Sequence, residues 1–147
     1  MAESDPVARN KEVVARFVEE VWNRGNPAAM EDLCHPDLVD HSDRFGTALG
    51  PGRRAALTAQ FERALGRPRV AVHDLFGERD LVAVRGTLTG THQEEWFGVE
   101  PAGRRVAIDG VLIARLREGR IAELWVHYDA EELVRQLRGE APHAPPG

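Results

Sequence analysis

The sequence predicts one α+β domain, with helices in the first half of the chain and an antiparallel sheet in the second. Two observations predict this class. Apolar residues recur about every 3.6 positions up to Leu65 and then alternate with polar residues from Arg69 onward. Short turn segments separate the alternating runs, as in consecutive hairpins. Helices followed by hairpins predict helices packed on one face of an antiparallel sheet.

Three helices are expected in the first half. Asp5-Pro6 supplies an N-cap acceptor and a proline at the first helical position, and Gly25 and Gly66 supply C′ positions. The expected helices are residues 6–24, 27–34 and 53–65. An extended piece at Leu38–His41 and a polar, glycine-rich surface loop at residues 42–52 separate the second helix from the third.

Four strands and a last helix follow. The expected strands are residues 69–76, 81–91, 106–116 and 120–128. Gly119 is expected at a positive φ in the last hairpin, and Asp129 with Glu132 forms a capping-box pattern that opens the helix. Because strands of about ten residues twist strongly, helices across the concave side leave a hollow of the kind that binds ligands.

Length and composition fit a single globular domain. The chain has 147 residues, 42% hydrophobic and 29% charged, which suffices for a core without a disulfide or metal. We expect residues 1–139 to form the domain and the Pro-, Ala- and Gly-rich residues 140–147 to be disordered. The net charge of −5 and the scattered basic residues argue against a nucleic-acid or anionic-membrane partner.

The location expected from the sequence is the cytoplasm. The N-terminus lacks the basic and apolar regions of a signal peptide, and no apolar run approaches the ~20 residues of a membrane span. The single cysteine, Cys34, cannot form an intramolecular disulfide, which suits a reducing compartment. Its helical context favours a small buried residue over a nucleophile.

Several sequence strings occur together in a recognisable order and spacing. They are Asn10–Val14, Val21–Asn26, His35–His41, Gly90–His92, Gly98–Arg104 and Gly119–Trp125. With them the chain resembles the SnoaL-like polyketide cyclases, a branch of the nuclear transport factor two-like superfamily, from residue 10 to about residue 138. The resemblance implies a cone-shaped, cystatin-like α+β barrel, in which a curved sheet and three to four helices enclose an apolar pocket.

The resemblance also implies a chemistry. The family's cyclases close a ring by an intramolecular aldol reaction, with a base that removes a proton beside a carbonyl and a donor that stabilises the enolate. No cofactor is implied, and no histidine or carboxylate set has metal-ligand spacing. The family's acid–base aspartate falls on Val126 and its partner histidine on Leu112, so the resemblance implies that the standard pair is absent.

Other side chains are candidates for the missing acid–base groups. The candidates are His41, His92, Glu95 and Tyr128. An imidazole suits proton transfer near neutral pH, and His41 lies in a region that faces the pocket in the superfamily. The alternatives are a loop histidine bonded to backbone for His41, a rim residue for His92 and a solvated carboxylate for Glu95.

A ligand pocket would be lined mainly by apolar and aromatic side chains. The candidates are Phe17, Trp22, Phe45, Trp96, Leu112 and Val126. Phe17 and Trp22 would form one wall, and Phe45 in the long loop could act as a lid. Core packing is the alternative for Phe17.

Strand parity separates two faces of the sheet. On the last strand, Val126 and Tyr128 share the face of Leu112, whereas Ile121 and Glu123 lie on the other. That other face also carries Val111, Ile113, Trp125 and His127. Because it is too apolar for open water, and because the resemblance implies dimerisation through the sheet, we expect a homodimer there.

The sequence therefore favours an enzyme of the cyclase or isomerase kind, which acts on a small apolar, polyketide-like molecule through a non-standard acid–base set. The valine and leucine at the expected catalytic positions support an alternative, a non-catalytic protein that binds an apolar ligand. A dimerising interaction module with a closed pocket is a third possibility.

Overall fold

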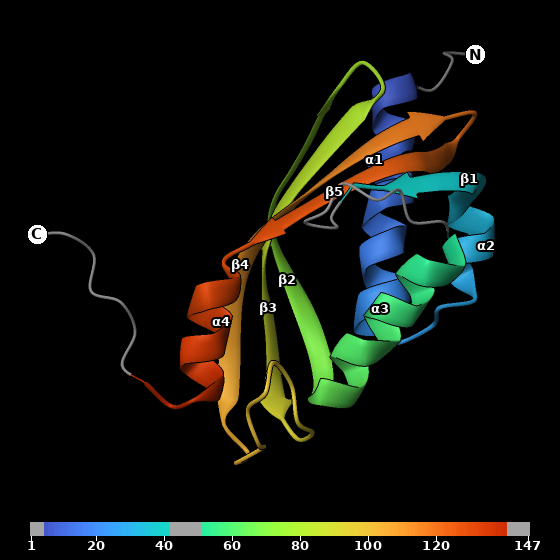
Figure 1. Cartoon of the computed structure of the whole chain (residues 1–147). Coiled ribbons are helices and arrows are strands. Elements are labelled where there is room, and N and C mark those ends of the chain that lie inside the picture. Colours follow the sequence, from blue (N-terminus) through green and yellow to red (C-terminus); the bar gives the residue numbers. More distant parts are fainter. Residues whose placement is uncertain (1–4, 42–50, 141–147) are drawn as a thin grey trace, which may run out of the picture.

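The computed structural model describes residues 5–41 and 51–140, and the side chains of residues 51–57 fall outside this description. Within these residues the chain forms an open, curved, five-stranded sheet with the order β1-β5-β4-β3-β2 (Figure 1). The strands are β1 (Cys34–Asp40), β2 (Leu65–Glu78), β3 (Leu81–His92), β4 (Arg105–Arg117) and β5 (Arg120–Tyr128). The edge strands β1 and β2 lie at opposite ends of this order, so the described sheet does not close into a barrel.

The predicted hairpins are confirmed, but the sheet is mixed. β2 to β5 pair antiparallel in chain order, whereas β1 pairs parallel with β5. The antiparallel pairing of the four predicted strands is therefore confirmed, and the extended piece adds a parallel edge strand that the sequence did not predict. The extended piece begins at Cys34, and by pairing with β5 it satisfies backbone groups that would otherwise be exposed at a sheet edge.

The first helical segment has two parts. α1 (Pro6–Phe17) continues into a π-helical stretch, η1 (Val18–Asn23). The Asp5 carboxylate accepts from the backbone N–H of Val7 at 3.0 Å, which confirms the predicted N-cap. Gly25 has the positive φ of 61° expected just beyond the helix.

The bounds of the next two helices differ from the predicted ones: α2 is shorter, and α3 begins and ends earlier. α2 (Ala29–Leu33) ends before Cys34, which is buried as expected but extended, because Pro36 disfavours helical geometry just before it. α3 (Pro51–Ala64) leads directly into β2. A register shift after Gly66 and a φ of 50° at Arg67 let the chain enter the sheet four residues earlier than predicted.

A bulge also changes the face of one residue. The pairing of β4 with β5 shifts between Arg115 and Leu116, so that Ala122 is the extra residue of β5. Ile121 is consequently fully buried in the core. The prediction that Ile121 shares the face of Glu123 is wrong for this reason.

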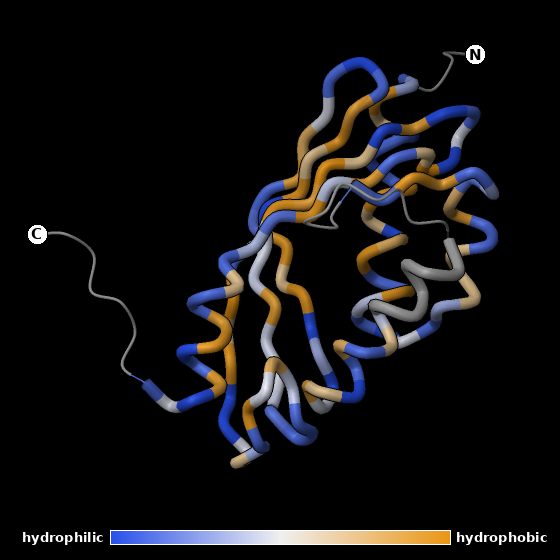
Figure 2. Tube along the Cα trace, in the orientation of Figure 1, coloured by the Kyte–Doolittle hydropathy of each residue, from blue (hydrophilic) through white to orange (hydrophobic). Residues whose placement is uncertain are grey.

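The core lies between the sheet and the helices α1, η1, α2 and α3. Figure 2 shows apolar residues along the strands and on the neighbouring helices. One apolar cluster joins α1 and η1 to the middle of the sheet, and a second joins α4 (Ala130–Leu137) to β4. Phe61 and Leu88 pack against both clusters.

The last helix is positioned by its cap. The Asp129 carboxylate accepts from the backbone N–H of Glu132 at 3.0 Å, as predicted for the N-cap. Leu133 and Leu137 are buried against β4, which α4 accompanies in Figure 1.

Candidate functional site

Three aromatic side chains from distant parts of the chain meet around a fourth, that of Phe61. Its ring lies edge-on to Trp22 at 5.4 Å, to Trp96 at 4.8 Å and to Tyr128 at 6.2 Å, measured between ring centroids. These residues come from η1, α3, the turn after β3 and the end of β5. Such edge-to-face contacts are favourable aromatic geometry. We call Trp22, Phe61, Trp96 and Tyr128 the aromatic cluster.

The aromatic cluster joins three of the predicted site residues. Trp22 and Trp96 are buried, and Tyr128 is 37% exposed. The sequence did not single out Phe61 as their common contact, because its i, i+4 spacing with other apolar residues is typical of helix packing. Phe17 is fully buried in the core, where its packing alternative places it. Phe45 lies outside the described residues.

The two apolar residues at the positions of the family's acid–base pair lie opposite each other. Leu112 of β4 pairs in register with Val126 of β5. Both pack in the cluster that contains Trp22, and Leu112 is 9% exposed. These two positions therefore present apolar side chains and no group that could transfer a proton. The same face carries the carboxyl of Asp40, which is fully buried and pairs in register with Leu124.

His92, the last residue of β3, is fully buried. Among the described residues, neither of its ring nitrogens has a hydrogen-bond partner, although its backbone N–H donates to the Arg104 carbonyl at 2.8 Å. At this position His92 pairs with Leu65 of β2, so β3 stays in the sheet to its end. A buried, unpaired polar group costs about 1–3 kcal/mol, so this imidazole is a candidate to meet a ligand or water.

The imidazole is displaced from the positions of the family's acid–base pair. Val84, the partner of Leu112 on β3, precedes His92 by eight residues, on the order of 25 Å along a straight strand. His92 instead pairs with Leu65, which packs in the cluster that contains Trp96. Leu65 follows Phe61 by four residues, at the junction of α3 and β2.

His41 lies on the opposite face of the sheet. Its Nε2 is 2.8 Å from a Glu123 carboxylate oxygen, and its ring stacks on Trp125 at 4.8 Å. Trp125 pairs with Ile113, on the face away from Leu112 and Val126. The expectation that His41 faces the same pocket as Val126 is wrong, because the parallel pairing of β1 leads it to the outer face.

Glu95 is exposed and fastens a turn. Its Oε1 accepts from the backbone N–H of Gly98 at 2.8 Å, inside the turn closed by Trp96 and Val99. The structure does not bring Glu95 together with His41 in one acid–base set.

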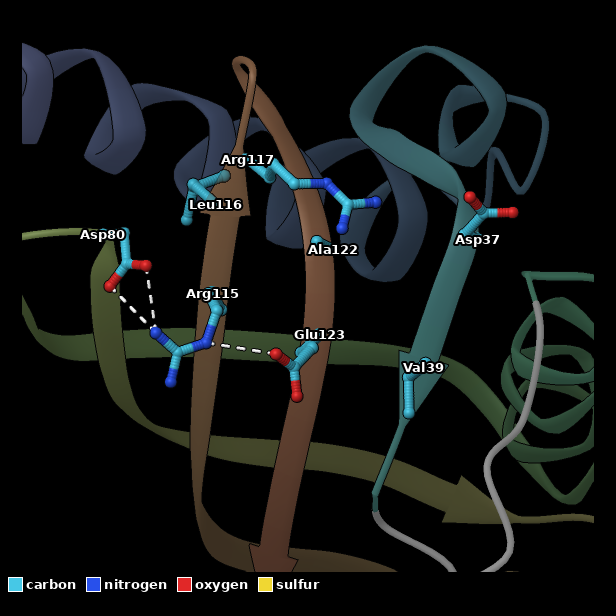
Figure 3. Close-up of a pocket in the computed structure, with 8 residues that line it drawn as sticks. All are labelled: Asp37, Val39, Asp80, Arg115, Leu116, Arg117, Ala122 and Glu123. Atoms are coloured by element: carbon cyan, nitrogen blue, oxygen red, sulfur yellow. Dashed lines mark hydrogen bonds and ion pairs between the residues drawn. The ribbon is translucent and has the colours of Figure 1, made fainter.

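A cavity of about 280 Å³ that the sequence did not indicate opens beside β1, β4 and β5 (Figure 3). It is lined by Asp37, Val39, Asp80, Arg115, Leu116, Arg117, Ala122 and Glu123. Arg115 donates to Asp80 at 2.9 Å and to Glu123 at 3.1 Å. Hydrogen bonding and charge from Asp80, with a contribution from Glu123, raise the pKa of Arg115.

The polar groups of this outer cavity largely satisfy each other. Arg117 contacts the ring nitrogens of His35 at 3.1 and 3.2 Å, and Glu123 also holds His41. The buried face, by contrast, holds the imidazole of His92, which has no hydrogen-bond partner among the described residues. The inner face is therefore the stronger candidate site.

Two further observations concern only the part of the chain that the structure describes. No group of three or more His, Cys, Asp or Glu side chains is arranged there to hold a metal ion. No helix there is both long and apolar enough to cross a membrane.

Comparison with known proteins gives a consistent picture. The family model described as SnoaL-like polyketide cyclase matches residues 12–137. No curated protein matches the chain. AclR from Streptomyces galilaeus, a presumed hydroxylase, is 29% identical with a TM-score of 0.81, over 95% of this chain and 86% of its own.

Two further similar crystal structures are those of proteins described as polyketide cyclases. A presumed SnoaL-like polyketide cyclase from Jannaschia sp. CCS1 is 25% identical, with a TM-score of 0.81 and 99% of each chain covered. IdmH from Streptomyces antibioticus, a presumed polyketide cyclase, is 28% identical with a TM-score of 0.78, over 88% of this chain and 98% of its own.

Proposed function

Since the chain belongs to the SnoaL-like polyketide cyclase family, we propose that it is a small-molecule enzyme of the cyclase or isomerase kind. Its substrate is an apolar, polyketide-like carbonyl compound, and its reaction is proton transfer beside the carbonyl without a cofactor. The observation that carries this proposal is His92, fully buried and without a hydrogen-bond partner among the described residues.

His92 is the proton acceptor in this proposal. A neutral imidazole has one nitrogen free to accept a proton, and a general base of this kind contributes about 10²–10⁴-fold to a rate. A ring system lying along Phe61 would extend from the side of Leu65 and His92 toward Tyr128. The Tyr128 hydroxyl is the group proposed to donate to the carbonyl oxygen as the enolate forms.

A second function is favoured by a different observation. The Leu112–Val126 pair leaves both positions of the family's acid–base pair without an acid or base. A protein that binds an apolar ligand and returns it unchanged needs only this wall and the aromatic cluster. Binding without turnover would distinguish this function from the first.

The test is exchange of the α-protons of 1-tetralone, a bicyclic aryl ketone, for deuterium in heavy water, followed by NMR. We expect His92→Leu to lower the protein-catalysed exchange about 100-fold or more, since the base is removed. Its melting temperature should stay the same or rise, because a buried unpaired polar group is replaced by an apolar one.

The matched control is His73→Leu, which removes an exposed imidazole that contacts Thr87 on β3. It should leave the exchange unchanged. If His92→Leu exchanges as fast as the wild type, the assignment of the base is wrong. If the wild type binds 1-tetralone without exchange, the ligand-binding function replaces the catalytic one.

A further inference from the structure

The turn after β3 holds an aromatic residue in an unfavourable backbone conformation. Trp96 and Val99 exchange backbone hydrogen bonds of 3.1 and 2.9 Å, and Phe97 and Gly98 between them have φ angles of 51° and 73°. Glycine adopts the left-handed region without strain, but a bulky side chain there is an outlier. The other non-glycine residues with positive φ in the described chain are charged: Arg67, Arg79 and Glu118.

The strained residue also exposes its ring. Phe97 is 46% exposed, whereas the adjacent Trp96 is 6% exposed. The Glu95 carboxylate accepts from the Gly98 N–H at 2.8 Å, so a side chain outside the turn fixes the backbone that directs Phe97. An exposed apolar ring in a strained position contributes little to folding, and strain of this kind is concentrated at functional sites.

Phe97 extends the aromatic cluster to the surface. Its ring centroid is 4.9 Å from that of Trp96, and Trp96 lies 4.8 Å from Phe61. Phe61 in turn contacts Trp22 and Tyr128. A continuous series of rings therefore runs from exposed Phe97 to the buried inner face.

We propose that Phe97 is a specificity-determining residue at the entrance of the inner site, where its ring contacts flat, fused-ring ligands in preference to flexible aliphatic ones. This inference rests on the proposed function, because it takes the inner face as the binding site. Glu95 is a positioning residue in this arrangement, since it holds the turn and does not itself contact the ligand.

The experiment measures binding of 1,8-dihydroxyanthraquinone and of 1-dodecanol by tryptophan fluorescence. All proteins carry Trp125→Phe, so that of the three tryptophans only Trp22 and Trp96 report. We expect Phe97→Gly to weaken anthraquinone binding about tenfold, the loss that corresponds to one aromatic contact, and to change dodecanol binding by less than about twofold. The melting temperature should rise, because glycine relieves the positive φ.

Three further variants distinguish the effect of the Phe97 ring on binding from an effect on folding. Phe97→Tyr should bind the anthraquinone as tightly as the parent. Phe97→Leu keeps an apolar side chain without a ring, and it should bind the anthraquinone almost as weakly as Phe97→Gly. Phe76→Leu is the control, since Phe76 is 61% exposed on β2, and it should bind both probes unchanged.

Two results would overturn the inference. One is that Phe97→Gly binds the anthraquinone as tightly as the parent, or that none of the proteins binds it. The other is that Phe97→Gly weakens the binding of both probes equally and lowers the melting temperature, which would indicate a structural role. The His92→Leu exchange test stands apart: it can fail while Phe97→Gly still weakens the anthraquinone, and it can succeed while Phe97→Gly changes nothing.

Discussion

Strand pairing, and not the chemistry of the imidazole, sets the positions of His41 and His92. His41 follows β1, whose parallel pairing with β5 brings the ring to Glu123 and Trp125 on the outer face. His92 ends β3, whose alternation continues to its last residue, so its ring shares the buried face of Val84 and Gly90. An imidazole with a carboxylate partner is satisfied, whereas a buried one without a partner remains available for a ligand.

At the scale of single residues, the contacts of the Glu19 carboxyl also predict how stability depends on pH. The side-chain hydrogen bond from Asn23, assisted by Arg24, lowers the pKa of the Glu19 carboxyl below its ordinary value of 4.5. A group with a lowered folded pKa stabilises the fold above its unfolded pKa, and this contribution is lost as the pH falls through the folded pKa.

We therefore expect Glu19→Gln to reduce the loss of stability below about pH 4.5, measured as urea midpoints across the acid range. The matched control is Glu12→Gln, an exposed glutamate of α1. Identical pH profiles for the wild type and Glu19→Gln would contradict the role of this carboxylate.

At the scale of elements, two side-chain amides act as substitutes for a strand partner. Asn23 of η1 accepts from the Val70 N–H at 2.7 Å and donates to the Val70 carbonyl at 3.2 Å. Gln136 of α4 does the same for Ala107, at 2.8 and 3.0 Å. Each amide satisfies both backbone groups of one residue where a strand has a free edge, and so fastens a helix to the sheet.

We expect Asn23→Asp to destabilise the protein by about 1–2 kcal/mol, because a carboxylate cannot donate to the Val70 carbonyl and repels Glu19. Urea unfolding at neutral pH measures the change, and Gln136→Glu should act in the same direction. Asn10→Asp, within α1, is the control. An Asn23→Asp protein as stable as Asn10→Asp would show that the amide does not fasten η1.

At the scale of the whole molecule, the outer face of the sheet carries apolar side chains that the described chain leaves partly exposed. Val111 pairs with His127 and Ile113 with Trp125 on this face, and Val111 is 37% exposed. His73, Thr87 and Asp109 form a hydrogen-bonded line across three strands beside them. The face thus combines apolar side chains with an ordered polar row, as protein interfaces do.

We predict that the chain forms a homodimer through this face and that Val111→Glu lowers the mass toward that of a monomer. Light scattering after size-exclusion chromatography measures this, and the control is Val72→Glu, since Val72 is 44% exposed on β2. A wild type that is monomeric at every concentration tested would contradict the prediction.

The sequence by itself determined the features that depend on neighbouring residues. Asp5 and Asp129 are caps, Gly25 lies beyond its helix, and β3, β4 and β5 begin and end within one residue of their predicted bounds. Caps, turns and period are local, because they arise from backbone hydrogen bonds and side-chain spacing within a few residues.

Only the tertiary structure decided which distant residues meet. It paired β1 with β5, turned Ile121 inward through the bulge at Ala122 and gathered the aromatic cluster around Phe61. Of the candidate site, the sequence therefore supplied His92 and the three aromatic residues Trp22, Trp96 and Tyr128. It did not supply Phe61 as the common contact of the three aromatic residues, or the outward position of His41. Strand pairing and register are set by packing between segments far apart in the chain, which no local pattern encodes.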